Sequence, residues 1–256
     1  MKRAKGILIA VLSLIIVGCA SYIAYYYLSQ KDNEKVYEEV QKTAIKEVEE
    51  PKDTQEEPEE EKVQIPIDFA TLQAQNPDIY AWIQIEGTNI NYPVAQSATD
   101  NQFYLDHTID GTAGLPGSIY TENLNSKEFT DYNTVMYGHD MRDGSMFQNL
   151  HNYADPTYMQ EHPYVVIYTP TKKLTYEIFA AVTYDDRHVL YSYNFLSPDS
   201  RQQFLDSIYN GRSLGNIIRD DVQVTTNNRL LTLSTCVTGQ DDKRFLVEAV
   251  LISEEK

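Results

Sequence analysis

The sequence predicts a mainly β fold, a barrel or a sandwich, in the C-terminal part of the chain. Eight or so short apolar runs rich in β-branched and aromatic residues follow one another between residues 80 and 252, each bounded by turn residues. Helical periodicity is confined to a few short segments. The N-terminal part differs in composition, because an uncharged run is followed by an acidic one. We therefore divide the chain into residues 1–29, 30–62 and 63–256.

Residues 1–29 have the sequence of a membrane signal-anchor. Lys2, Arg3 and Lys5 precede a run from 6 to 28 that contains no charged residue, and about 20 apolar residues suffice to span a bilayer. Positive charge on the short N-terminal side predicts a cytoplasmic N-terminus and an extracellular remainder. The expected location is therefore the cell membrane, crossed once.

Two other interpretations of this segment are open. A cleaved signal peptide has a shorter apolar core and a small-residue cleavage site, whereas the apolar run here continues past Ala20 and Ser21. Lipidation at Cys19 is the second, since Ile16-Val-Gly-Cys19 is similar to a bacterial lipoprotein box. Mostly apolar residues also follow Cys19, and this favours the uncleaved anchor.

Residues 30–62 predict an acidic stalk or linker. They contain thirteen acidic and six basic residues and almost no aromatic ones. Residues 34–50 are rich in the helix formers Glu and Lys, which predicts a solvated helix, and the stretch after Pro51 has too little apolar surface to fold. The formal net charge of the chain is −17, which argues against nucleic acid as a partner.

The β pattern of residues 63–256 begins with a hairpin. Two apolar runs, residues 80–85 and 89–94, flank the turn sequence Glu86-Gly-Thr88. The other expected strands are also short apolar runs between turn residues: 117–120, 134–137, 164–168, 174–184, 222–226, 230–235 and 245–252. Strands of this number and length favour a closed or two-layered sheet.

Three helices are expected around this sheet. Residues 67–75 and residues 145–153 have apolar side chains at helical spacing. The clearest helix begins at Ser197-Pro198, where an N-cap residue precedes a proline in the first turn, and Gly211 suits its C-terminal end. All three are expected to pack on the strands.

The candidate nucleophile is Cys236, which ends the run that begins at Arg229. The other cysteine, Cys19, lies in the predicted membrane segment, so Cys236 has no partner for an internal disulfide. Arg244 follows eight residues later, at the start of the next apolar run. A thiol at the end of one strand and a guanidinium at the start of the next suit attack on a carbonyl and stabilisation of its oxyanion. A small buried cysteine and a solvated strand-edge arginine remain the ordinary alternative.

A nucleophilic thiol needs a proton acceptor, which is usually a histidine. Four of the five histidines are adequately explained as surface or partly buried polar residues: His107, His151, His162 and His188. His139 differs, because it ends a predicted strand and opens into a glycine-containing loop, a rigid platform of the kind that commonly holds catalytic groups. Spacing alone makes Cys236, His139 and Arg244 a candidate set and no more.

Several motifs resemble those of one enzyme family. Thr232-Leu-Ser-Thr-Cys236, with Arg244 after it, resembles the TLxTC signature of the sortases, the membrane-anchored cysteine transpeptidases of Gram-positive bacteria. Val135-Met-Tyr-Gly-His139 resembles the strand that carries their catalytic histidine. The segments that resemble class B sortases in particular extend across the domain: 76–83, 87–94, 100–105, 117–120, 144–147 and a helix near 198–210. This resemblance implies an eight-stranded sortase barrel with a few peripheral helices, one of them inserted before the cysteine strand, and with the three candidate residues at one end.

The resemblance also implies the reaction. Cys236 would cleave a C-terminal sorting motif of a secreted protein after its threonine, form a thioester and transfer the protein to a cell-wall amine. His139 would act as general acid and base, and Arg244 would stabilise the oxyanion or a substrate carbonyl. No metal or organic cofactor is implied. Some class B members have an acidic residue directly after the cysteine, where this chain has Val237 and Thr238, so no acidic residue is assigned to the site.

The implied partners are of two kinds. One is a secreted protein with an NPQTN-like, LPXTG-like or PPXTG-like sorting motif. The other is the acceptor amine, in a peptidoglycan stem peptide or in lipid II. The motif and the acceptor are not distinguished by the sequence, nor is wall anchoring distinguished from pilus assembly by a pilin-polymerising sortase.

Three functions of other classes remain open. A thiol peptidase that acts mainly by hydrolysis would use the same three residues. An L,D-transpeptidase also pairs a cysteine with a histidine, but its cysteine typically follows a small-residue-Gly pattern that is absent at Ser234-Thr235. A non-catalytic surface module is expected if the three groups do not converge.

Overall fold

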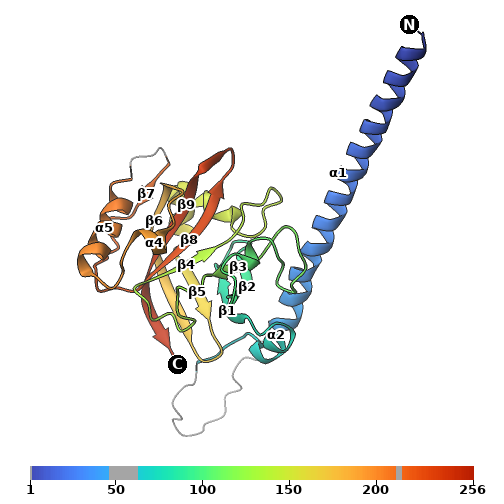
Figure 1. Ribbon diagram of the computed structural model, residues 1–256. Coiled ribbons are helices and arrows are strands. Elements are labelled where there is room, and N and C mark those ends of the chain that lie inside the picture. Colours follow the sequence, from blue (N-terminus) through green and yellow to red (C-terminus); the bar gives the residue numbers. More distant parts are fainter. Residues whose placement is uncertain (1, 46–62, 212–214) are drawn as a thin grey trace.

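The centre of the computed structural model, which describes residues 2–45, 63–211 and 215–256, is a closed β-barrel (Figure 1). Its strands in chain order are β1 (Ile79–Gln84), β2 (Asn91–Ala95), β3 (Ile119–Thr121), β4 (Asn133–Tyr137), β5 (Tyr164–Tyr168), β6 (Lys173–Asp185), β7 (Ile217–Ile218), β8 (Leu230–Val237) and β9 (Gln240–Glu255). Their order in the sheet is β5-β1-β2-β3-β4-β8-β9-β6-β7, and pairing of β5 with β6 closes it. The eight strands from β5 round to β6 form the barrel, and β7 extends the sheet outside the circle. The predicted eight-stranded barrel is thus confirmed.

The helices are short and peripheral, apart from the first. They are α1 (Lys2–Ala44), α2 (Phe69–Gln75), α3 (Pro156–Glu161), α4 (Val189–Ser192) and α5 (Pro198–Tyr209), with two 3-10 helices, η1 (Phe103–Leu105) and η2 (Gln148–Ala154). Helix α5 begins after Ser197 and has Pro198 in its first turn. It lies between β6 and β8 in the chain, which confirms the helix expected before the cysteine strand. The helix expected over 145–153 is the 3-10 helix η2.

Alternate residues of the long strand β9 face two hydrophobic cores. Phe245 and Val247 belong to the larger core, which most of the barrel strands share. Leu246 and Val250 belong to a smaller core, completed by Phe204 and other residues of α5. The period of two along a strand explains this division. The smaller core fixes α5 against the strands that carry Arg244 and Cys236.

One predicted strand is absent from the structure. Residues 222–226 are not paired with another strand. Instead, Thr225 donates its backbone N–H to the Asn228 side chain at 2.8 Å, and this contact forms a turn that leads into β8. The strand that does form in this region is β7, which pairs with Ala180 and Ala181 of β6.

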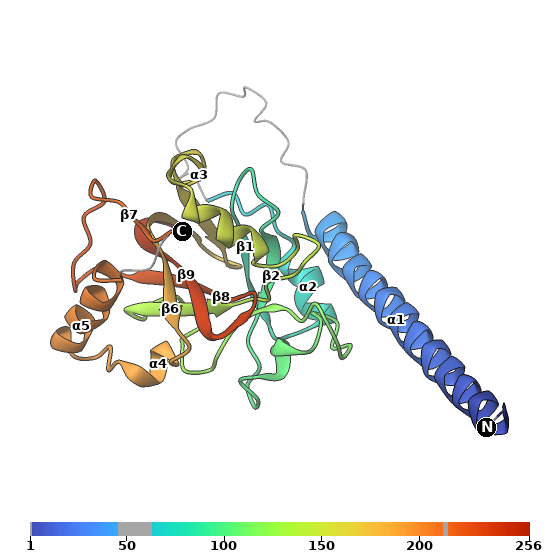
Figure 2. The same cartoon turned by 90° about the horizontal axis from the view of Figure 1, so that it is seen from above.

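The second half of α1 packs on the barrel and does not form a solvated spacer (Figures 1 and 2). Tyr37, Val40 and Ala44 have exposed fractions of 4%, 7% and 0%. Their spacing of three and four residues places them on one helical face. The acidic composition of residues 30–62 concealed this short apolar stripe. The stretch after Pro51 that we expected to be disordered lies outside the described residues.

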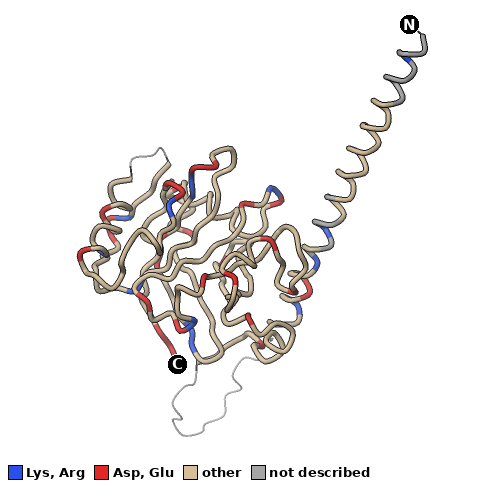
Figure 3. Tube along the Cα trace, in the orientation of Figure 1, with Lys and Arg blue, Asp and Glu red and all other residues tan. Residues whose placement is uncertain are grey.

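The first half of α1 projects away from the barrel, and a long stretch of it carries no charged residue (Figure 3). Within the described part of the chain, however, no helix combines the length and the apolar character that a membrane crossing needs. The single-pass crossing expected for residues 6–28 is therefore not supported by the structure.

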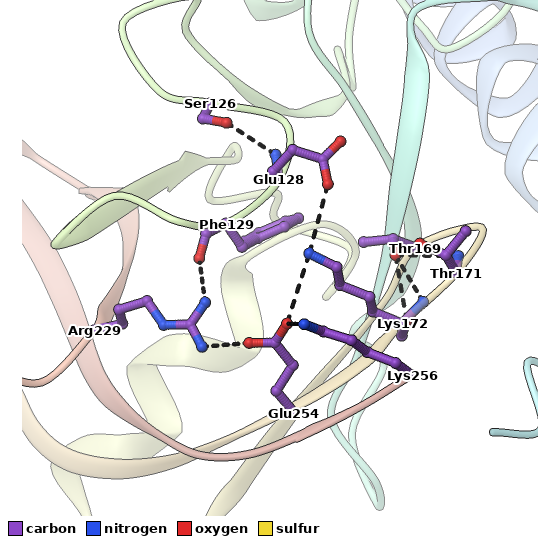
Figure 4. Close-up of polar contacts among 9 residues, drawn as sticks. All are labelled: Ser126, Glu128, Phe129, Thr169, Thr171, Lys172, Arg229, Glu254 and Lys256. Atoms are coloured by element: carbon purple, nitrogen blue, oxygen red, sulfur yellow. Dashed lines mark hydrogen bonds and ion pairs between the residues drawn. The ribbon is translucent and has the colours of Figure 1, made fainter. Parts of the chain in front are cut away.

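An ion-pair network joins the start of β8 to the end of β9 (Figure 4). Arg229 pairs with Glu254. Lys172 Nζ lies 3.6 Å from Glu254 Oε1 and 3.5 Å from Glu128 Oε2, and Lys256 Nζ lies 3.3 Å from Glu254 Oε1. The hydrogen bond from Arg229, with a further one from Lys256, lowers the pKa of Glu254 to about 2. The network lies at the opposite end of β8 from Cys236.

Candidate active site

The pairing of three strands explains why Cys236, His139 and Arg244 lie at one end of the barrel. Strands β4 and β8 are parallel neighbours, with Tyr137 paired to Ser234. Their C-terminal ends therefore lie side by side. His139 follows the C-terminal end of β4, and Cys236 lies at the C-terminal end of β8. Strand β9 is antiparallel to β8, and Arg244 is the residue directly opposite Cys236.

The three side chains line one pocket of about 230 Å³. The wall of this pocket also contains aromatic, acidic and basic residues from β3 and the position after it, from β4, and from the end of β6 and the segment that follows: Tyr120, Glu122, Tyr137, Asp185, Arg187 and His188. All three residues proposed from the sequence are thus brought together, although their catalytic roles remain proposals.

Hydrogen bonds fix the cysteine strand end to the histidine strand end. Gly138 donates its backbone N–H to Ser234 O at 3.2 Å, and Thr235 Oγ1 donates to Gly138 O at 2.8 Å. Gly138 is needed here, because a Cβ would come within 2.5 Å of the Ile119 side chain. Cys236 itself is exposed and carries a free thiol. The thiol therefore lies on a rigid backbone and is open to a ligand.

The ring of His139 is held by a backbone carbonyl. His139 Nε2 lies 2.6 Å from Leu105 O. A carbonyl oxygen only accepts, so Nε2 carries the proton in this contact. In the neutral ring, Nδ1 is then the nitrogen with the free lone pair. The contact leaves one defined ring nitrogen available for proton transfer.

The guanidinium of Arg244 is braced by the β8–β9 turn. Its Nη1 donates to Asp241 O at 3.0 Å and to Lys243 O at 2.7 Å. Within the described residues it has no other hydrogen bond, so its Nε and Nη2 donors remain for a ligand. The guanidinium is planar and is held through Nη1, so its Nε and Nη2 donors are oriented to bind a carbonyl or an oxyanion.

Two histidines that the sequence did not single out contact this region. His188 pairs with the buried Glu122 at 2.8 Å, on the pocket wall. His151 Nε2 lies 3.0 Å from Cys236 O and 3.4 Å from the Asp140 carboxylate, so it contacts the main chain of the cysteine. The position of Glu122 directly after β3 was the available sequence signal, since polar residues at neighbouring strand ends share an edge of the sheet.

Two tyrosines of the pocket wall keep their hydroxyl protons. Burial, reinforced by the Glu122 carboxylate, raises the pKa of both Tyr120 and Tyr137 above its usual range. Both hydroxyls therefore stay protonated at neutral pH. The Tyr137 hydroxyl is buried and, among the described residues, has no hydrogen-bond partner. A buried donor without a partner is costly, and Tyr137 carries this cost at the pocket wall.

Comparison with known proteins gives consistent matches over this domain. The family model described as the sortase domain matches residues 83–252. Proteins named sortase B from Listeria monocytogenes and Staphylococcus aureus are each 31% identical to the chain, over 185 and 186 residues. These alignments cover 72% of this chain and 73% and 74% of the two relatives.

The solved structures agree. The crystal structure of sortase B from B. anthracis in complex with AAEK1 is similar to this chain with a TM-score of 0.71 and 28% sequence identity. The superposed region covers 89% of this chain and 99% of that one. The similarity therefore extends over most of this chain and nearly all of that one.

Proposed function

The chain belongs to the sortase family of cysteine transpeptidases and is most similar to its class B members, and we propose that it attaches secreted proteins to the cell wall through Cys236, His139 and Arg244. The observation that carries these roles is that the three side chains line one pocket at the end of parallel strands. The family membership points to a function associated with the cell wall.

In the first step of the proposed reaction, the Cys236 thiolate attacks the threonine carbonyl of the sorting motif. Arg244 stabilises the oxyanion through its free guanidinium donors, a task for which the loss of one donor costs about 3 kcal/mol. The C–N bond after the threonine breaks, and His139 gives its proton to the departing amine. The protein is left as a thioester on Cys236.

In the second step, the acceptor amine attacks the thioester carbonyl. His139, now neutral, takes a proton from this amine. The C–S bond breaks, and the Cys236 thiolate is restored beside a protonated His139. The two half-reactions return the enzyme to its starting protonation state, as a ping-pong scheme requires.

The proposed substrates follow from the family. The donor is a secreted protein with an NPQTN-like, LPXTG-like or PPXTG-like motif, and the acceptor is an amine of the peptidoglycan stem peptide or of lipid II. Tyr120, Tyr137 and the Glu122–His188 pair line the pocket and are the residues that would lie against the motif beside the reacting carbonyl.

Membrane attachment is a separate proposal, because no described helix meets the requirements of a crossing. It rests on residues 6–28, which contain no charge, and on the exposed apolar side chains of α1, such as Leu14 at 72% and Ile16 at 67%. Recovery of the full-length protein in the soluble fraction of its native cells would contradict it.

The catalytic proposal is tested by trapping the intermediate. The full chain is incubated with peptides of the three motif types, with and without an amine acceptor, and the products and protein adducts are identified by mass spectrometry. We expect an acyl adduct on Cys236, transfer product with the amine, and hydrolysis product without it. Cys236→Ala should abolish the adduct, whereas the matched variant Cys19→Ala should retain it. Turnover by Cys236→Ala, or hydrolysis that an added amine does not divert, would refute the proposal.

A further inference from the structure

We propose that Tyr37, on helix α1, is a positioning residue that holds the His139 ring in its working orientation through the loop of residues 103–118. The inference rests on the proposed role of His139 and extends it to an element outside the barrel. Tyr37 itself does not line the pocket that contains Cys236.

Among the described residues, the polar contacts of the Tyr37 hydroxyl are all with this loop. It donates to Gly117 O. It accepts the backbone N–H of Ile109 at 3.2 Å and lies 3.0 Å from Ser118 Oγ. The side chain is 4% exposed and packs edge-on against Tyr92, with ring centroids 5.7 Å apart. Burial raises its pKa above the usual range, so the hydroxyl keeps its proton and continues to donate.

Gly117, the acceptor of this hydrogen bond, lies against both His139 and the atom that holds it. A Cβ at Gly117 would come within 2.6 Å of Leu105 O and 3.1 Å of His139 Cδ2. Leu105 O is the acceptor for His139 Nε2. The backbone at Gly117 has a φ of +65°, which favours glycine. The residue whose carbonyl Tyr37 holds therefore leaves no room for a side chain between itself, the His139 ring and Leu105 O.

The 103–118 loop is tied internally, so that a displacement of Gly117 reaches Leu105. Ser118 donates its backbone N–H to Tyr104 O at 2.9 Å, and Ser118 Oγ donates to His107 O at 2.9 Å. Gly114 donates to Asp106 O at 2.7 Å. These bonds join the two ends of the loop on either side of Leu105.

The chemical consequence concerns proton transfer more than substrate binding. The contact with Leu105 O places the proton on Nε2 and leaves Nδ1 as the free nitrogen. A looser loop lets the ring rotate and change tautomer, and small misplacements of a catalytic group slow the reaction strongly. Leu105 is the residue of this loop that lines the pocket, whereas the walls from β4, β6, β8 and β9 are separate from it, so we expect kcat to change more than the KM for the motif.

The test compares two α1 variants in the full chain. Tyr37→Phe removes the hydroxyl and keeps the packing. Gln41→Met is the matched control, because Gln41 Nε2 also donates from α1 to a barrel carbonyl, Asn91 O, at 2.7 Å, but on β2. Each variant is measured by thermal unfolding, by kcat and KM for peptide transfer, by the pH profile of kcat, and by the NMR signal of the His139 ring over a pH titration.

We expect Tyr37→Phe to lower kcat roughly 10-fold with KM within about two-fold, to change the pH profile of kcat, and to move the His139 ring signal. Gln41→Met should leave all of these as in the parent chain. Should Tyr37→Phe fail to fold, Ser118→Ala removes the neighbouring hydroxyl and is expected to act in the same direction.

Two outcomes would overturn the inference: an unchanged His139 signal and pH profile in Tyr37→Phe, or equal effects of Tyr37→Phe and Gln41→Met. The NMR titration needs no turnover, so it decides the positioning role even if the trapping experiment refutes the transpeptidase chemistry. Full activity of His139→Ala would refute the proposed function alone.

Discussion

The side chain of Arg244 illustrates how much of this site depends on geometry within one residue. One nitrogen of its guanidinium is committed to two backbone carbonyls of the β8–β9 turn. That bracing aims the rest of the fork across the strand pair from Cys236. A lysine has the same charge, but its donors are all on one nitrogen, so it does not bind the turn and a ligand through separate groups as arginine does.

Arg244→Lys should therefore lose most of the activity although charge is kept. We expect kcat/KM for peptide transfer to fall about 100-fold, as when one oxyanion donor is removed. The control is Lys243→Ala, which removes the neighbouring charge and its surface pair with Asp242. Near-parental transfer by Arg244→Lys would remove the residue from the proposed mechanism.

Glu248 is a second residue whose environment has a measurable effect. It is completely buried beside Thr232, and this burial raises its pKa to about 8. The unfolded value is lower, so the folded protein binds the proton more tightly. Its contribution to stability is full below about pH 4.5 and is lost as the pH rises toward about 8.

Glu248→Gln should remove this pH dependence. Urea unfolding at pH 5, 7 and 9 is expected to show that the parent chain loses on the order of a few kcal/mol across this range and that the variant loses much less. Parallel curves for the two proteins would show that Glu248 titrates normally in the fold.

The sequence identified the three pocket residues because each lies at the edge of an apolar run, where spacing and residue type are informative. It missed the groups that act through position alone. The partner of His139 is the main-chain carbonyl of Leu105, and any residue supplies a carbonyl. The Glu122–His188 pair joins two loops that meet only in the closed barrel.

At the scale of the elements, the strands were predicted well and the first helix was not. Short apolar runs located β1, β2, β4, β5, β6 and β8 to within two residues, whereas β9 begins five residues before the expected run of 245–252 and ends three residues after it. Residues 222–226 have the right composition for a strand, but the Asn228 side chain stabilises a turn there. In α1, the short stripe of Tyr37, Val40 and Ala44, with Val36 beside it, packs on the core. Acidic residues are more numerous in this part of the sequence, so the stripe was overlooked.

Helix α1 should therefore contribute to stability only through its second half. Deletion of residues 2–45 removes the buried stripe, worth roughly 4 kcal/mol for Tyr37 and Val40 together, and should lower Tm by roughly 10 °C. Deletion of residues 2–30 leaves that stripe and should leave Tm nearly unchanged. Calorimetry on the two truncated chains decides this, and equal Tm values would mean that the packing contributes nothing.

At the scale of the molecule, the two ends of the barrel differ in what they hold. One end holds the pocket, and the other holds the network of Arg229, Glu254 and Lys172 (Figure 4). This network connects β8, β9 and the β5–β6 turn. It also joins these strands to the loop before β4 through Glu128 and Phe129.

Glu254→Gln should weaken the fold most at neutral pH. The pKa of Glu254 is depressed to about 2, so its stabilising effect is present above about pH 4.5 and is lost as the pH falls toward 2. We expect a loss of about 1–2 kcal/mol at pH 7, discounted for partial exposure, and convergence with the parent chain in acid. Denaturant unfolding as a function of pH tests it, and a difference that persists at pH 2 would contradict the assignment.

The unbroken course of α1 determines how far from a bilayer the chemistry would take place. A helix rises about 1.5 Å per residue, so Leu28 and Tyr37 are about 14 Å apart along the axis. If residues 6–28 lie in lipid, as proposed, a short continuous helix holds the barrel at a fixed distance from the membrane. A flexible linker would allow that distance to vary. Secreted chains would then be captured as they leave the membrane surface, before they reach the outer layers of the wall.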